Sequence, residues 1–435
     1  MVFVVRCARG GLQALRGATV KAKAGCKSKV ILSRQLCLNG GPMNQLQRPF
    51  STAEMRQRIN NTKHRMQASD TDLLLVSCPA NIFYLSGYDA CSYYTHQMLI
   101  VSLTEDQPIL VVRKMDELGA LLTVYMKPEN VLSYGDDLVG ADSSHPMDFI
   151  ASIIRSRNWG SKSISVEMDN YYYSARCHEV LTSQLPNANF KDANRLVNWV
   201  RAVKSPVELE YMIQAGKIST QAMYEAVNEI APGVRQSQVA AKIYYREICG
   251  DDAHSGEYMC KPPLLPTGRL SATPHLTWVD AAHKQGELTS IELGACRHRY
   301  HAPLARAIHL GAPPTQLKET ATILIEGLTA VVESVRPGVT CGEVDGVWRR
   351  VINRYGVLKD SRIGYPVGIG YPPTWGELTY SLRSSDRTIL KPNMTFHCIP
   401  GIWTNEWGLM ISESLRVTES GALCLCEFPR ELIVK

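Results

Sequence analysis

The cysteines and histidines of this sequence are candidate ligands of a zinc site, and the cysteines could also form disulfides. The 435 residues contain 13 cysteines and 11 histidines. The cysteines are spread along the whole chain without a CxxC pair, and no histidine follows them at the spacing of a zinc site. Cys424 and Cys426 are too close together to suggest a paired ligand set. We therefore predict free, buried thiols in a reducing compartment.

The first part of the chain predicts an α/β domain over residues 51–192. Ser51-Thr-Ala-Glu54 is typical of a capping box and predicts a helix to about residue 66. Four later segments have the apolar runs that are typical of strands: residues 72–77, 97–102, 108–113 and 163–167. One helical stretch is predicted at residues 147–157.

A second domain is expected over residues 200–435. Ser205-Pro206-Val207-Glu208 places a hydroxyl at the N-cap, proline at the first helical position and an acid at the third. This pattern predicts a helix that runs to about residue 231 and stops at Pro232-Gly233. Strands dominate after residue 258, and the remaining helices are predicted at residues 236–249, 316–335 and 341–355.

The positive charge of the chain is confined to its N-terminus. The formal net charge is +6, but residues 1–53 hold nine of the 47 basic side chains and no acid, which leaves 38 basic against 41 acidic side chains afterwards. A nucleic-acid site needs positive charge on a folded face, so we predict no nucleic-acid partner. The sequence has no run of 18 apolar residues, and we predict no membrane span.

Residues 1–50 form a basic leader that resembles an organelle transit peptide, because basic and small residues occur there without acids. A disordered basic tail or a mis-assigned start codon is the alternative. We expect a mitochondrial location if the leader acts as a transit peptide and a cytoplasmic one otherwise.

Motifs in the second half resemble those of the creatinase/prolidase/methionine aminopeptidase superfamily (peptidase family M24). They occur in the family's order: Arg201-Ala-Val-Lys204-Ser205-Pro206, Pro266-Thr-Gly268 with Pro274-His275, Glu292-Leu-Gly294, Pro400-Gly401, and Glu413 before Val417-Thr418. An ordered set of this length, within a resemblance over residues 52–435, is specific. It implies a mixed α/β (α+β) fold: a pita-bread catalytic domain behind a smaller creatinase-type N-terminal domain.

The metal ligands that the resemblance implies are largely missing. Members that hydrolyse peptides hold two divalent metals with two Asp, one His and two Glu, at positions that correspond here to Glu292, Pro303, Tyr365, Ile399 and Glu413. Pro303 and Ile399 have no side-chain donor, and two carboxylates cannot hold a pair of hard ions. We therefore predict no metal and no cofactor. A mononuclear site rebuilt with His301 or His397 is the alternative.

One branch of the superfamily, the ectoine hydrolases, shows this pattern of lost ligands. The chain is similar to that branch at Gly87–Asp89, Pro263–Pro266, Arg299–Arg306, Tyr371–Glu377 and Met394–His397. The resemblance implies a metal-independent, homodimeric hydrolase that opens the cyclic amidine of ectoine, a zwitterionic compatible solute, to N-acetyl-2,4-diaminobutyrate. The alternatives are a non-catalytic pseudo-peptidase that binds a protein or a solute, and a metal-dependent dipeptidase or dimethylsulfoniopropionate lyase.

Within this resemblance, Glu292, His275 and Glu413 are the candidate catalytic residues. Glu292 either activates water or attacks the amidine carbon, and an ion pair with Arg306 is its structural alternative. Glu413 is expected to approach Glu292 across the site, so that the two carboxyl groups divide the roles of acid and base. His275 is expected to protonate the leaving nitrogen, unless it is only a satisfied polar residue.

The candidate substrate-binding residues are polar or aromatic. Tyr365 replaces a histidine ligand and keeps a hydrogen-bond donor for a substrate carboxylate. Trp278, Trp375 and Trp403 are candidates for enclosing the flat cation, at least one of them being plain core. The remaining candidates are His301, His397, Tyr94 and His96. The last two lie in a segment that reaches the partner's active site in dimeric relatives, and a loop packed within its own domain is equally compatible.

Overall fold

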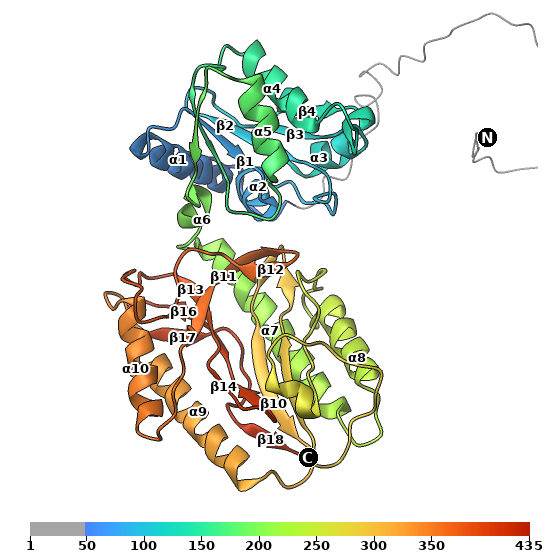
Figure 1. Ribbon diagram of the computed structural model, residues 1–435, viewed down its shortest axis with the longest axis vertical. Helices are drawn as coiled ribbons and strands as arrows, with labels where there is room; N and C mark the ends of the chain where they lie inside the picture. Colours follow the sequence, from blue (N-terminus) through green and yellow to red (C-terminus); the bar gives the residue numbers. More distant parts are fainter. Residues whose placement is uncertain (1–47) are drawn as a thin grey trace, which may run out of the picture. The chain divides into compact units, whose positions relative to one another are not determined.

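The computed structural model describes residues 48–435 of the chain (Figure 1). The described residues, 48–435, belong to one compact unit. The transit-peptide prediction falls on residues 1–50, of which 1–47 lie outside the described residues, and it stays a prediction. No helix within residues 48–435 is both long and apolar enough to cross a bilayer.

Six strands form a mixed sheet in the N-terminal part, in the order β4-β3-β2-β1-β5-β6. Four of them were predicted and lie within two residues of the expected bounds: β1 (Leu73–Val76), β2 (Met98–Ser102), β3 (Ile109–Arg113) and β5 (Ser163–Val166). The strands β4 (Val131–Tyr134) and β6 (Asn189–Asp192) were not predicted. Their short, partly exposed segments lack the continuous apolar run that marks a central strand.

Helices connect the strands of this sheet. The helices α1 and α4 begin where the sequence predicted, and Ser51 Oγ accepts a hydrogen bond from the backbone N–H of Glu54 at 3.1 Å. The helices of this part are α1 (Thr52–Ala68), α2 (Pro79–Ser86), α3 (Glu117–Thr123), α4 (Pro146–Ser156), α5 (Ala175–Gln184) and α6 (Leu196–Val200).

The second half places its strands between two pairs of helices. Figure 1 shows α7 (Pro206–Glu229) and α8 (Gln236–Cys249) on one side, and α9 (Thr315–Ser334) and α10 (Cys341–Asn353) on the other. These four helices confirm the sequence-based prediction to within two residues at their ends.

Two larger sheets and a hairpin lie in this half. A three-stranded sheet has the order β18-β10-β7, with β7 at Leu288–Leu293, β10 at Leu304–His309 and β18 at Leu432–Val434. A seven-stranded sheet has the order β17-β16-β13-β11-β9-β8, and β12 pairs with β11. Its strands are β8 (Cys296–Arg297), β9 (Tyr300–His301), β11 (Gly364–Tyr371), β12 (Thr374–Gly376), β13 (Thr395–Cys398), β16 (Glu413–Val417) and β17 (Ala422–Cys424). The hairpin pairs β14 (Gly401–Trp403) with β15 (Gly408–Met410).

A buried ion triad fixes the chain just after β12 to the segment before α7. The carboxylate of Glu377 accepts from Arg201 Nη1 at 3.2 Å and from Lys204 Nζ at 2.6 Å. All three side chains are buried. Because two cations share one carboxylate without access to water, this contact holds the β11–β12 hairpin in one position.

The N-terminus of α7 provides a test of how local sequence contributes to stability. Ser205 Oγ accepts from the backbone N–H of Glu208 at 3.3 Å, and Ser205 N–H donates to Glu208 Oε2 at 2.7 Å. We expect Ser205→Ala to lower the free energy of unfolding by about 1 kcal/mol in urea denaturation. The control Ser161→Ala, in an exposed turn, should change it by less than about 0.5 kcal/mol. Equal losses in both variants would contradict the cap's contribution.

Candidate active site

Four of the predicted site residues form a buried cluster. Tyr365 on β11 is the cross-strand partner of His397 on β13, and partners in register point to the same face of a sheet. The Tyr365 hydroxyl lies 3.1 Å from His397 Nδ1, and Trp375 Nε1 donates to that hydroxyl at 3.1 Å. Glu292 Oε1 on β7 lies 3.9 Å from His397 Nδ1. The structure therefore brings Glu292, Tyr365, His397 and Trp375 together.

Two members of this cluster were not predicted. Lys261 Nζ donates to Glu292 Oε1 at 3.0 Å and lies 4.0 Å from the centre of the Trp375 ring. Ser412 Oγ lies 2.7 Å from His397 Nε2. Neither residue belongs to a motif of fixed spacing, so the sequence held no signal for them. The Lys261 side chain is 21% exposed, and solvent therefore reaches the cluster beside its ammonium group.

The polar groups around the pair of Glu292 and Lys261 are neutral. Burial raises the pKa of the Tyr365 phenol far above its ordinary value, and the charge of Glu292 adds to this. Burial also lowers the pKa of His397 well below its ordinary value, with further contributions from Lys261 and Arg306. The ion pair between Glu292 and Lys261 is therefore surrounded by a phenol and an uncharged imidazole.

Both ring nitrogens of His397 have polar neighbours. Nδ1 lies 3.1 Å from the Tyr365 hydroxyl, which itself accepts from Trp375 Nε1, and Nε2 lies 2.7 Å from Ser412 Oγ. A chain of hydrogen-bond contacts thus runs from Trp375 to Ser412 past the Glu292 carboxylate.

Glu413 lies on the opposite face of the sheet. In the pairing of β13 with β16, His397 is opposite Ser414 and Cys398 is opposite Glu413, so the Glu413 side chain points away from His397. Glu413 Oε1 instead accepts from Arg306 Nη2 at 3.0 Å and Arg430 Nε at 2.9 Å. The structure does not show the expected approach of Glu413 to Glu292, because successive side chains of a strand alternate in direction. The alternative pairing of Glu292 with Arg306 is not found either, since Arg306 pairs with Glu413.

The remaining predicted residues have contacts elsewhere. His275 is exposed in the loop after the 3-10 helix η5 (Gly268–Ala272). Trp278 packs edge-to-face with Tyr244, and Trp403 lies 4.5 Å below Lys359 Nζ. The described contacts do not join these residues to Glu292.

His301 and the two N-terminal candidates differ in their distance from the cluster. The His301 ring centre lies 6.0 Å from that of Trp375, so His301 borders the cluster. Tyr94 is 76% exposed, which leaves it accessible to another molecule. His96 instead faces His145 and Cys177 within its own domain.

The donor set around Glu292 does not fit two divalent metals. Its carboxylate is bound by the ammonium of Lys261, and both ring nitrogens of His397 have hydrogen-bond partners. His301 is also engaged at both nitrogens, with the carbonyl of Arg299 at 3.0 Å and the backbone N–H of Cys260 at 3.3 Å. Pro303 and Ile399, where the sequence resemblance implies two of the ligands, have no side-chain donor, and this set therefore offers few of the anionic oxygens that hard cations require.

Buried neutral histidines make stability depend on pH. Burial, followed by the charge of Arg299, lowers the pKa of His301 to about 3. Below the unfolded-state value of about 6.5, the unfolded chain binds a proton that native His301 does not, so acidification favours unfolding. We expect His301 to account for a loss of about 2 kcal/mol between pH 6.5 and pH 5. Urea denaturation at pH 6.5 and pH 5 should show a smaller loss of the free energy of unfolding in His301→Asn than in the wild type. The same dependence on pH in both proteins would contradict the assignment to His301.

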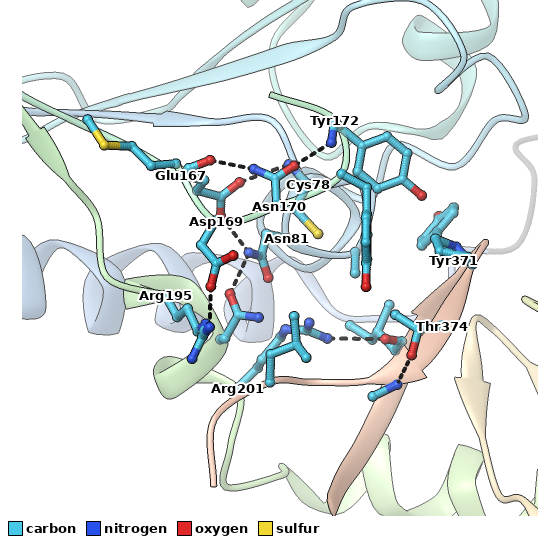
Figure 2. A pocket seen from close by; sticks show the side chains of 18 of the residues that line it. Cys78, Asn81, Glu167, Asp169, Asn170, Tyr172, Arg195, Arg201, Tyr371 and Thr374 are labelled. Carbon is cyan, nitrogen blue, oxygen red and sulfur yellow. Dashed lines mark hydrogen bonds and ion pairs between the residues drawn. The ribbon is translucent and has the colours of Figure 1, made fainter. Parts of the chain in front are cut away.

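Figure 2 shows a different pocket, with a volume of about 320 Å³. The described residues that line it include none of the predicted site residues. Its charged groups are already paired within the protein: Arg195 with Asp169, and Glu167 with the backbone N–H groups of Ser77 at 2.9 Å and Cys78 at 2.8 Å. We therefore do not place the reaction in this pocket.

The fold and the cluster define a two-domain enzyme of the creatinase/prolidase type. The model of metallopeptidase family M24 matches residues 210–419, and that of the creatinase/prolidase N-terminal domain matches residues 58–203. The chain belongs to this family and is a hydrolase, and the predicted fold of a pita-bread domain behind a creatinase-type domain is confirmed.

Individual relatives cover nearly the whole chain. It is 42% identical to an ectoine hydrolase of Halomonas elongata, over 90% of this chain and 100% of that protein. An uncharacterised hydrolase/peptidase of Sinorhizobium fredii is also 42% identical, over 89% of this chain and 98% of the relative. The solved prolidase of Pyrococcus horikoshii is 24% identical with a TM-score of 0.73, covers 87% of this chain and 100% of its own, and supports the fold alone.

Proposed function

We propose that this chain hydrolyses the cyclic amidine of ectoine and that it does so without a metal at Glu292. The observation that carries the proposal is the ion pair of buried Glu292 with the partly exposed Lys261 against the face of Trp375. The identity of 42% to an ectoine hydrolase supports the substrate.

The ion pair is complementary to a zwitterion. Ectoine carries an amidinium and a carboxylate. When it binds, its amidinium can pair with Glu292 in place of Lys261, and its carboxylate can pair with Lys261 in place of Glu292. The Trp375 ring, which lies beneath the ammonium of Lys261, offers a face to the flat cation. Tyr365 and His397 keep the surroundings uncharged, which strengthens both contacts.

The reaction adds one water across the amidine. The water oxygen bonds to the amidine carbon, the ring C–N bond breaks, and the departing nitrogen takes a proton, giving N-acetyl-2,4-diaminobutyrate. Glu292 serves this step either as the base that removes a proton from water or as the nucleophile that first attacks the carbon. A covalent adduct of substrate and Glu292, detected by mass spectrometry of rapidly quenched protein, would identify the second route.

The test combines substrate with removal of metal. The full chain, treated with a chelator and checked by elemental analysis, is incubated with ectoine while product formation is followed by NMR. We expect unchanged turnover after chelation. Turnover that disappears with the metal and returns on its addition would overturn the metal-independent mechanism, and no turnover of ectoine in either state by folded protein would overturn the substrate.

We also propose that the active form is a homodimer in which Tyr94 contacts the partner's substrate. The support is the exposure of Tyr94, in a loop that precedes β2. Light scattering should give twice the mass of one chain, and Tyr94→Ala should raise KM for ectoine without lowering stability. A monomer with full activity would contradict this proposal.

A further inference from the structure

Three potential metal ligands converge in the N-terminal part of the chain, away from the Glu292 cluster. His96 precedes β2, His145 is the N-cap of α4, and Cys177 lies in the first turn of α5. One ligand atom from each residue lies within 4.8 Å of the other two. These residues come from three separate segments, which is why their spacing in the sequence carries no motif.

His145 has a ring nitrogen available to a metal ion. Its Nδ1 atom accepts the backbone N–H of Met147 at 3.2 Å, which leaves Nε2. Cys177 Sγ lies 3.6 Å from His96 Nδ1 and 3.9 Å from its Nε2.

The distance between Cys177 and His96 matches that of a zinc-type ion. With Zn–S near 2.3 Å and Zn–N near 2.05 Å, tetrahedral geometry places sulfur about 3.6 Å from nitrogen and two nitrogens about 3.3 Å apart. The observed Cys177–His96 distance of 3.6 Å equals the first value. The ligand atom of His145 lies within 4.8 Å of the other two, so the His145 ring must move closer to them to complete the set.

The surroundings supply support and access. Ser174 Oγ lies 3.3 Å from Cys177 Sγ, where it can donate to a thiolate, and the carbonyl of His96 accepts from the Tyr134 hydroxyl at 2.7 Å. A pocket of about 350 Å³ is lined by both His96 and His145, so water can reach a fourth coordination position.

We propose that His96, His145 and Cys177 bind one borderline-soft divalent ion of the zinc type, with water as the fourth ligand. On binding, the Cys177 thiol gives its proton to solvent and the sulfur coordinates as thiolate. This site gives His96 a role other than substrate contact. Metal found in the purified protein would then belong to the N-terminal domain and not to Glu292.

Cobalt provides a direct probe of this site. The full chain is stripped with chelator, dialysed and titrated with Co²⁺, and its absorption spectrum is recorded. We expect one equivalent to bind with a thiolate-to-cobalt charge-transfer band in the near ultraviolet, and Zn²⁺ to displace it. Cys177→Ser should abolish the band, and His145→Asn should weaken binding at least about tenfold while keeping an N-cap for α4. Circular dichroism checks that each variant is folded.

Matched controls separate this site from other thiols and from the active site. Cys91→Ser removes an exposed free cysteine, and Glu292→Gln alters the catalytic cluster; both should keep the cobalt band and its stoichiometry. A wild-type protein without the band would overturn the proposal. A band that persists in Cys177→Ser, or equal affinity in the wild type and His145→Asn, would overturn it as well.

Discussion

Glu292→Gln is expected to lower kcat for ectoine hydrolysis by about 10³-fold, because the amide can neither accept a proton from water nor attack the amidine carbon. Glutamine has nearly the same shape as glutamate, so it can remain between Lys261 and His397. The variant should therefore stay folded and lose chemistry. Initial rates by NMR, together with urea denaturation, measure the two effects separately.

The control for this prediction is Glu431→Gln, which changes an exposed carboxylate in the last segment of the chain. Its kcat should equal that of the wild type. If Glu292→Gln kept more than about a tenth of wild-type kcat, Glu292 would be neither base nor nucleophile, and the proposed mechanism would fail.

Glu413→Ala is expected to lose much of its stability and to keep its kcat, the reverse of Glu292→Gln. Glu413 Oε1 lies between Arg306 and Arg430, and the Arg306 side chain is fully buried. Removing one partner of a buried pair leaves an uncompensated charge and costs about 3–5 kcal/mol. Urea denaturation should show this loss in the free energy of unfolding, while the remaining folded protein keeps its kcat.

The matched control is Glu179→Ala, which breaks an exposed ion pair with Arg176 at 2.8 Å. Surface pairs of this kind contribute about 0–1 kcal/mol, so its stability should change little. Wild-type stability of Glu413→Ala combined with lost activity would restore Glu413 as a catalytic residue and contradict the structural role.

The local sequence determined the elements that carry the site. The capping patterns at Ser51 and Ser205 fixed the start of α1 and of α7, because a hydroxyl that accepts a backbone N–H acts within one turn. The apolar runs fixed the central strands for a similarly local reason. The lack of a side-chain donor at Pro303 and Ile399 could also be read directly, since a side chain without a donor cannot bind an ion anywhere in the fold.

Only the tertiary structure decided which side chains meet. Glu413 and Ser412 are neighbours in the chain, yet the pairing of β13 with β16 turns one toward the two arginines and the other toward His397. Lys261 reaches Glu292 from a segment 31 residues away. Such contacts depend on strand register and on packing between distant segments. A change of one residue in register would reverse the face on which each side chain lies.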